Sequence, residues 1–302
     1  MEQLKNSFSE HVQQLQNEII DAMKELDPKI VVKKDQWERL DRAGNPGGGG
    51  LTCAISGDIF ENAGVNTSIV YGEMDPKFGR QILRETNVES EEKKYHMWAS
   101  GISLILHPYN PRVPTVHANF RMIQVNDKFW FGGGADLTPY YPNKEDFSFF
   151  HQVWKKASGE DYGLWKKTCD EYFVNHHRGG EMRGIGGIFF DHYNSGDTKK
   201  DFEKVVHVSK HFIESYFPIA KKRYQETYSE EDVDFQLHRR GRYVEFNLLH
   251  DRGTTFGLKT NGRTDSILIS LPGRCKFSYA YQPKKDSIHE SMMENFFPKE
   301  WA

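Results

Sequence analysis

Polar side chains that could carry chemistry alternate along residues 115–125. His117, Asn119 and Arg121 supply a base, an amide and a cation at every second position. Because side chains alternate between the two faces of a β-strand, a strand here places all three on one face, over roughly 13 Å at about 3.3 Å per residue. The intervening side chains are apolar and predict the core-facing side of that strand: Val116, Ala118, Phe120 and Met122.

The preceding segment repeats this pattern. Within residues 101–107, Ser103 and His107 fall on one face of a strand, and apolar side chains fill the other. The connection 108–114 contains three prolines, which favour a stiff and short return between paired strands. If the two polar faces point the same way, they form a single polar surface.

This surface has two interpretations. Polar alternation usually marks a sheet face in contact with water. Solvated faces favour Lys, Glu and Thr, however, whereas Ser, His, Asn and Arg are side chains that bind ligands. A ligand-binding face is therefore the alternative.

A glycine run and an acid follow the second predicted strand of a hairpin. Gly132, Gly133 and Gly134 allow a sharp turn or the close approach of another group to the backbone. Asp136 comes just beyond them. It either caps a turn or belongs to the polar surface, and spacing does not separate these two hypotheses.

Four histidines can be taken as a metal site: His107, His117, His151 and His177. Their spacing matches no compact ligand motif such as H-E-x-x-H. A histidine outside such a motif is more often a hydrogen-bonded polar residue than a ligand.

The glycine-rich stretches do not match a nucleotide motif. No Gly-Lys-Ser/Thr follows residues 47–50, so these are predicted to form a flexible loop. Residues 176–191 lack the G-x-G-x-x-G pattern of a dinucleotide fold.

Residues 239–253 are predicted to include a strand with one polar face, made of Tyr243, Glu245, Asn247 and Asp251. Part of this block echoes a signature of RNA-recognition domains, but its glycine-to-aromatic spacing is incomplete. The formal net charge of −3 also argues against a nucleic-acid partner.

Composition indicates a globular protein, since 37% of the 302 residues are hydrophobic and 27% are charged. Cys53, Cys169 and Cys275 lie far apart, which fits packing residues in a reducing compartment better than a disulfide framework. The N-terminal stretch resembles neither a signal peptide nor a transit peptide, and no segment is predicted to span a membrane. We therefore expect a cytoplasmic protein.

The elements that must position these residues follow an irregular order. Without regular β-α-β alternation, they predict an α+β fold with a large, mainly antiparallel sheet flanked by helices, in a single domain over residues 1–302. Periodicity predicts helices at 4–26, 145–157, 160–178 and 201–228, the last with a kink or a restart at Pro218. It predicts strands at 67–74, 102–106, 115–125, 233–238, 242–249, 266–271 and 276–281, and another through Phe129 and Phe131.

Four blocks, taken in this order, resemble the oxygen-dependent coproporphyrinogen III oxidases: residues 114–121, 130–139, 183–191 and 241–248, the last continuing into 251–258 and 262–268. The resemblance implies a flat antiparallel sheet sandwiched by helices. It implies a homodimer, with a segment from Tyr243 to about Ser278 at the interface. The implied reaction converts coproporphyrinogen III and O2 into protoporphyrinogen IX, CO2 and hydrogen peroxide during haem synthesis, without a required cofactor.

The same resemblance assigns residues. His117 matches the family's proposed proton donor, and Asp136 and Arg121 match its acid and arginine implicated in catalysis. Substrate-binding positions are matched by Ser103, Asn119, Phe120, Arg121, Asn261, Gly262 and Arg263. Positions sometimes assigned to a divalent metal are matched by His107, His117, His151 and His177.

The implied chemistry agrees with the polar surface. A tetrapyrrole with four propionates is flat and anionic, and Arg121, Arg263 and Arg252 can hold carboxylates through paired N–H donors. Our hypothesis is that ionised Asp136 accepts pyrrole N–H bonds while His117 moves protons as a propionate loses a β-hydrogen and CO2. The rival hypotheses are a metal-dependent oxygenase that uses the histidines and a non-catalytic tetrapyrrole carrier.

Overall fold

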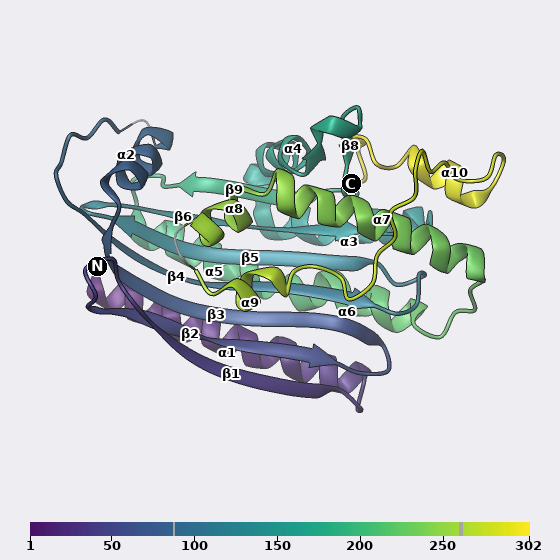
Figure 1. The fold of residues 1–302 in the computed structure, drawn as a ribbon, viewed down its shortest axis with the longest axis horizontal. Coiled ribbons are helices and arrows are strands. Elements are labelled where there is room, and N and C mark those ends of the chain that lie inside the picture. Colours follow the sequence, from purple (N-terminus) through teal and green to yellow (C-terminus); the bar gives the residue numbers. More distant parts are fainter. Residues whose placement is uncertain (87, 260–261) are drawn as a thin grey trace.

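One antiparallel sheet of seven strands forms the centre of the fold (Figure 1). The computed structural model describes residues 1–86, 88–259 and 262–302. The predicted α+β class with a mainly antiparallel sheet is confirmed. In sheet order the strands are β1 (Val31–Leu40), β2 (Pro46–Ser56), β3 (Phe60–Met74), β4 (Tyr95–Pro108), β5 (Thr115–Val125), β6 (Lys128–Thr138) and β9 (Gly187–Tyr193).

Helices cover both faces of this sheet (Figure 1). One layer consists of α1 (Glu2–Leu26), α3 (Lys144–Ser158), α5 (Thr198–Lys210) and α6 (Phe212–Arg223), and α7 (Glu230–Leu249), α8 (Arg252–Lys259) and α9 (Thr264–Leu268) lie on the other face. Around these elements lie α2 (Pro76–Glu85), α4 (Tyr162–Tyr172), α10 (Ile288–Met293) and the paired short strands β7 (Val174–Asn175) and β8 (Glu181–Met182). Within the described ranges, no helix has the length and apolarity needed to cross a membrane.

The main core lies between the sheet and the layer that contains α1 and α3. The predicted apolar stripe of α1 is buried there except at its two ends, where Leu4 and Leu26 are partly buried. Gln16 of α1 donates a hydrogen bond to the carbonyl oxygen of Val65 on β3. Phe120 of β5 packs against Trp154 of α3. The apolar side chains of β5 therefore face this layer, and the polar side chains of the same strand face α7 and α9.

The prediction for residues 230–249 is wrong. The strands predicted at 233–238 and 242–249 are a single helix, α7, which begins with a capping box between Ser229 and Asp232. The prediction failed because arginines occupy two buried positions, which hides the helical period of the buried side chains. These side chains include Phe235, Gln236, Arg239, Arg240, Tyr243, Phe246 and Asn247.

Other predicted elements near the C-terminus also differ. Residues 266–271 contain the end of α9 rather than a strand, and residues 276–281 form no regular element. The helix predicted at 160–178 ends at Tyr172. The helix predicted at 201–228 is two helices that meet at His211, and Pro218 lies inside the second of them.

The glycines at 47–50 form part of β2 rather than a flexible loop. They pair with β1 on one side and β3 on the other. Gly48 has a positive φ of 84°, and a Cβ there would lie 2.0 Å from the carbonyl oxygen of Ile69. Close backbone packing thus requires glycine at this position.

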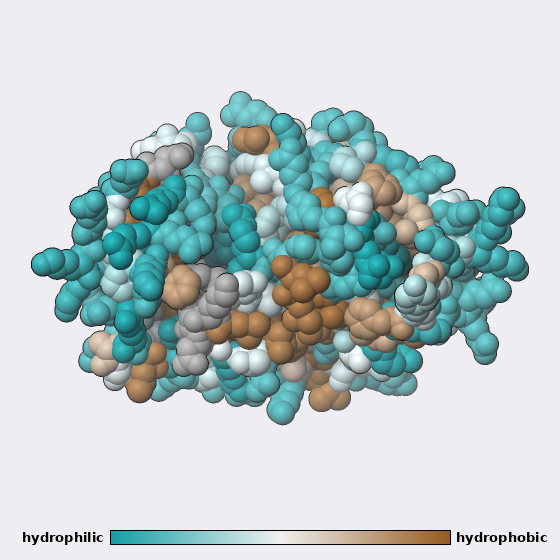
Figure 2. All heavy atoms as spheres, turned by 45° about the horizontal axis from the view of Figure 1, so that its top comes forward, coloured by the Kyte–Doolittle hydropathy of each residue, from teal (hydrophilic) through white to brown (hydrophobic). Residues whose placement is uncertain are grey.

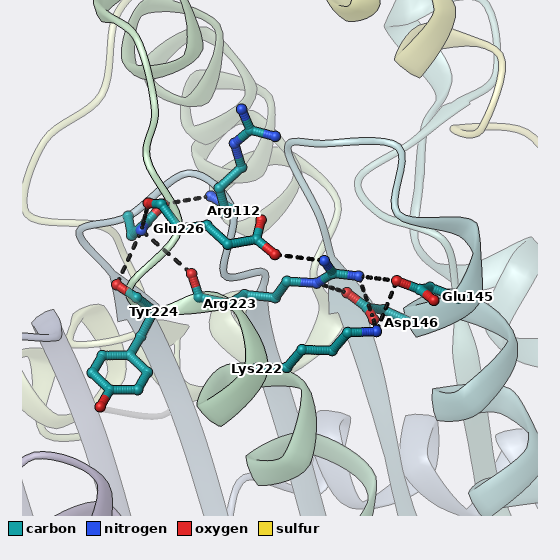
Figure 3. A network of polar contacts seen from close by, with 8 residues as sticks. Arg112, Glu145, Asp146, Lys222, Arg223, Tyr224 and Glu226 are labelled. Carbon is teal, nitrogen blue, oxygen red and sulfur yellow. Dashed lines mark hydrogen bonds and ion pairs between the residues drawn. The ribbon is translucent and has the colours of Figure 1, made fainter.

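A network of charges joins the start of α3 to the end of α6 (Figure 3). The buried guanidinium of Arg223 donates from Nε to Asp146 Oδ2 at 2.8 Å and from Nη2 to Asp146 Oδ1 at 3.0 Å. Glu226 accepts from its Nη1 at 2.6 Å. Lys222 is half exposed and reaches Glu145 from outside at 2.8 Å.

We predict that Arg223→Met lowers the free energy of unfolding by about 3–5 kcal/mol, because it removes the cation that is hydrogen-bonded to both oxygens of the buried Asp146 and leaves only Lys222, at 3.9 Å. Lys222→Met is the control and should change this free energy by less than about 1 kcal/mol, since its ion pair is exposed. Chemical denaturation measures both. Equal losses in the two variants would contradict the assignment of Arg223 as the central charge.

Candidate active site

His117 and Asp136 face each other across two central strands. They are partners in the register of β5 and β6, and residues paired across antiparallel strands share a face of the sheet. His117 Nδ1 lies 2.9 Å from Asp136 Oδ1. The structure therefore brings together the predicted base and the predicted acid.

A third charged residue completes this contact. Arg183 lies between β8 and β9 and donates to both oxygens of Asp136, from Nε at 2.9 Å to Oδ2 and from Nη2 at 2.7 Å to Oδ1. The side chains of Arg183 and Asp136 are only 2% and 1% exposed. Asp136 thus has three hydrogen bonds from within the protein and little contact with solvent.

Three aromatic rings and one amide surround the guanidinium of Arg183. Phe173 follows α4, and the other three residues belong to α7. The Cζ atom of Arg183 lies 4.1 Å from the ring centre of Phe173, 4.5 Å from that of Tyr243 and 4.9 Å from that of Phe246. Nη1 donates to Asn247 Oδ1 at 2.8 Å. Cation–π contacts of this kind are strongest where the cation is removed from water.

The charge of Arg183 decides the protonation of Asp136. Burial alone raises the pKa of a carboxyl group, but here the charge of Arg183 and the hydrogen bonds from His117 and Arg183 outweigh burial and hold the pKa of Asp136 below its ordinary value. An ionised carboxylate only accepts hydrogen bonds. Nδ1 of His117 therefore carries the proton, and in the neutral ring Nε2 is the free acceptor.

The other predicted polar residues share this face of the sheet. Ser103 pairs with Asn119, and Gly101 pairs with Arg121, across β4 and β5. Ser103 is exposed, and His117, Asn119 and Arg121 are partly exposed. Among the described residues, no hydrogen-bond partner is present for two buried atoms here, Asn119 Oδ1 and Arg121 Nε.

Arg121 has an acidic partner that the sequence did not reveal. Its Nη2 donates to Asp191 Oδ2 at 3.0 Å, and Arg252 Nη2 lies 3.9 Å from the same oxygen. A Cβ on Gly132 would lie 2.8 Å from Arg121 Nε and 2.9 Å from Asp191 Oδ1. The glycine run therefore leaves room for this pair of charges.

The remaining predicted substrate-binding residues lie elsewhere. The side chain of Phe120 points to the opposite face and is buried in the core. Arg263 is the residue before α9 and forms an ion pair with Asp35 of β1. Gly262 donates its N–H to the carbonyl oxygen of Gly257 at 2.8 Å. Asn261 lies outside the described residues.

The four histidines predicted as metal positions do not converge. His107 is buried and contacts Thr115 Oγ1 at 3.1 Å and the carbonyl oxygen of Ser270 at 3.0 Å. His151 is buried on α3, in the layer on the opposite face, between Tyr162 and Ile185. The ring nitrogens of His177 contact Glu245 and His250 near the surface.

Each of these three histidines has protein partners on both ring nitrogens, so the four positions do not fit a common metal site. The described part of the chain contains no group of three or more His, Cys, Asp or Glu side chains placed to hold a metal ion.

Arg183 was not predicted as a site residue, although it begins one of the family-like blocks. Its partners come from β6 and α7, at least 47 residues away along the chain, and no local pattern marks such a contact. Asn247 was noted, but as part of a strand. In the helix, Tyr243 and Asn247 are one turn apart and share a face.

Asp251, predicted on the same strand face, lies just before α8. It accepts hydrogen bonds from Thr254 and from the hydroxyl of Tyr172. Glu245 is separated from it and pairs with Arg178 at 2.6 Å.

Comparison with known proteins points to one family. The sequence matches the family described as coproporphyrinogen III oxidase over residues 7–301. It is 44% identical over 282 residues to a protein of Drosophila melanogaster named oxygen-dependent coproporphyrinogen-III oxidase, and the match covers 89% of this chain and 71% of that protein.

The buried histidines make stability sensitive to acid. Burial lowers the pKa values of His107 and His151 to about 3. The unfolded chain binds a proton at each near pH 6.5, whereas the folded chain binds it only near pH 3. Acidification through this window therefore favours unfolding.

We predict that each of these two histidines removes about 1.4 kcal/mol of unfolding free energy per pH unit as the pH falls from 6.5 to 4. His151→Gln should show a slope that is smaller by this amount, although it is less stable at pH 7. Urea denaturation at pH 7, 6, 5 and 4 measures the slopes. Parallel curves for wild type and variant would contradict the pKa assigned to His151.

Proposed function

Since this chain belongs to the coproporphyrinogen III oxidase family, we propose how its polar face carries out the reaction of that family. The chain is an oxidoreductase of porphyrin biosynthesis that decarboxylates coproporphyrinogen III oxidatively, with O2 as the acceptor. The observation that supports a role for this face is that His117, held by Asp136, lies four residues from Arg121 on the same side of β5.

The reaction defines what the residues must do. Each propionate arm loses CO2 and one β-hydrogen, and two electrons leave the substrate as the vinyl group forms. O2 takes up these two electrons and two protons and becomes hydrogen peroxide. A group beside the reacting arm therefore has to exchange a proton, and other groups have to hold an anionic ring.

We propose His117 as the proton-exchanging group. Its Nδ1 is committed to Asp136, so Nε2 is the atom left to meet the substrate, and no protein partner for Nε2 is found among the described residues. The ring is also held edge-on against Phe173, with 6.1 Å between ring centres. A single ring nitrogen is thereby presented toward the partly exposed face.

We propose the arginines as carboxylate-binding groups. Arg121 and Arg252 share one acid, Asp191, so this cluster carries one positive charge in excess. Arg121 is four residues from His117, which corresponds to roughly 13 Å along the strand. A second carboxylate of a large flat ring could reach this cluster while another propionate reacts at His117.

The acceptor for pyrrole N–H groups is better assigned to Asn119 than to Asp136. Asp136 is almost fully buried, and His117 and Arg183 already occupy its oxygens. Asn119 Oδ1 is a buried acceptor without a partner in the described part of the chain. Native proteins rarely leave such an atom unpaired, and a ring N–H would satisfy it.

We propose that the reaction requires no cofactor and that O2 is a co-substrate. This is supported by the poor fit of the four histidines to one metal site. The rival metal-dependent oxygenase would need the histidines to meet, and the rival carrier would bind the ring without releasing CO2.

An aerobic assay tests the function. Purified enzyme with coproporphyrinogen III should release CO2 and yield protoporphyrinogen IX, measured by protoporphyrin fluorescence after oxidation, and the anaerobic control should yield none. Activity should persist after dialysis against a strong chelator. Binding without CO2 release would support the carrier, and activity lost to chelator and restored by a divalent metal would support the metal-dependent oxygenase.

We propose that the protein is a homodimer that uses part of the segment from Tyr243 to Ser278. Tyr243 is buried within the chain, but Leu249 and Phe277 are 64% and 59% exposed. Figure 2 shows apolar side chains gathered near the middle of one face of the molecule. Exposed apolar side chains of this kind favour association.

Light scattering should give twice the chain mass of 35.1 kDa. The double substitution Leu249→Lys with Phe277→Lys should shift the protein to monomer. Leu164→Lys is the matched control, because Leu164 is 66% exposed on α4, outside the segment. A dimer lost equally in the control, or kept in the double variant, would contradict this surface.

The cytoplasmic location expected from the sequence stays a prediction. Cys53 and Cys169 are buried and unpaired, which agrees with a reducing compartment. Cys275 is exposed, so the expectation that all three cysteines are packing residues does not hold for it. Cell fractionation is the direct measurement.

A further inference from the structure

We propose that Arg183 is a positioning residue for this reaction: through Asp136 it fixes the imidazole of His117 so that Nε2 points to the substrate. The inference rests on the proposed role of His117. It adds Arg183 as a residue that acts on His117 without touching the substrate. It also assigns Asp136 to the orientation of His117.

Burial excludes direct contact between Arg183 and the substrate. Its side chain is 2% exposed and is surrounded by Phe173, Tyr243 and Phe246. Three of its N–H bonds already point to Asp136 and Asn247. Any effect of Arg183 on catalysis must therefore pass through its neighbours.

Hydrogen bonds connect Arg183 to His117 and so can transmit its effect. A guanidinium that binds both oxygens of a carboxylate fixes the plane of the carboxylate as well as its position. Asp136 Oδ1 is the oxygen shared by Arg183 Nη2, at 2.7 Å, and His117 Nδ1, at 2.9 Å, and the same Nη2 also lies 3.2 Å from His117 Nδ1. Arg183 thus sets the direction from which the imidazole donates, and so the direction in which Nε2 points.

Stability does not account for this arrangement. A buried ion pair can often be replaced by apolar side chains without loss of stability. The chain has another pair of similar burial, Arg239 with Glu181, but no hydrogen bond connects that pair to His117 or Asp136. Arg183 differs because its acidic partner, Asp136, also binds the proposed base, His117.

Helix α7 binds the guanidinium nitrogen of Arg183 that does not contact Asp136. Asn247 accepts from Arg183 Nη1 and donates from Nδ2 to Ser270 Oγ at 3.2 Å. This amide keeps the guanidinium in the plane that suits Asp136. Asn247→Leu, of similar size, would loosen Arg183 without removing a charge.

Steady-state kinetics of the full chain with coproporphyrinogen III and O2 tests the proposal. Arg183→Met should lower kcat by about 100-fold, since a shift of about 1 Å in a catalytic group has that effect, and should change KM by less than about threefold. Arg121→Met should give the opposite split, with KM raised more than kcat is lowered. A rise in KM for Arg183→Met with kcat unchanged would overturn the proposal.

A double-mutant cycle separates positioning from general damage. If Arg183 acts through Asp136, Arg183→Met combined with Asp136→Asn should lose no more in kcat than the worse single variant, because residues that act as one unit are not additive. The double variant should also melt higher than Arg183→Met alone, because the unpaired buried carboxylate is gone. Multiplying effects on kcat would overturn the proposal.

Arg239→Met is the matched control for the loss of a buried arginine. It should lower the melting temperature but leave kcat of the folded fraction within about threefold, and its effect should multiply with that of Asp136→Asn. If Arg183→Met does not fold, Asn247→Leu replaces it, with an expected loss of three- to tenfold in kcat and an unchanged KM. An unchanged kcat in Asn247→Leu would then overturn the proposal.

The wild type separates the two levels of inference. If wild-type enzyme releases no CO2, the proposed function fails. If the wild type releases CO2 but the effects of Arg183→Met and Asp136→Asn on kcat multiply, only the proposed role of Arg183 fails.

Discussion

The ion pair between Asp136 and Arg183 is the interaction on which the proposed active site depends. A carboxylate that is 1% exposed would be strongly disfavoured in its charged form without a cation in contact. The pair also joins three parts of the chain, since Asp136 belongs to β6, Arg183 precedes β9, and Asn247 of α7 holds the guanidinium. His117 acquires its orientation only where these parts meet.

Much of the polar face could be predicted because its pattern is local. Alternation along residues 115–125 places His117, Asn119 and Arg121 together, and the register of β5 with β6 adds Asp136 to them. The same reasoning failed for α7. Arg239 and Arg240 are fully buried there beside acids from β8 and β3, and a pattern that treats every arginine as exposed cannot detect a buried face of this kind. Arg183 was missed for the related reason that its partners are distant in sequence.

The arrangement of charge supports the proposal that a chain of net charge −3 binds an anionic substrate at this face. Several of its arginines are neutralised inside the protein, as Arg223 is by Asp146 and Arg240 by Glu61. Arg121 and Arg252 are different, because both lie near a single acid, Asp191, and both keep some exposure. The electrostatic potential at this face therefore depends on the arginines that acidic side chains neutralise only in part. The net charge of the whole molecule does not determine it.

The distance in sequence between the residues of this network has a consequence for biosynthesis. During synthesis, residue 136 emerges from the ribosome well before residue 247, and segments that have emerged can begin to fold. Until α7 docks, the apolar residues around Arg183 are uncovered and Asp136 has no fully assembled counter-charge. A nascent chain can therefore build much of the sheet early, but the contacts that orient His117 are complete only after α7 has been made. A chain that ends after β9 but before α7 would contain the hairpin of β5 and β6 and would lack the helix that holds Arg183.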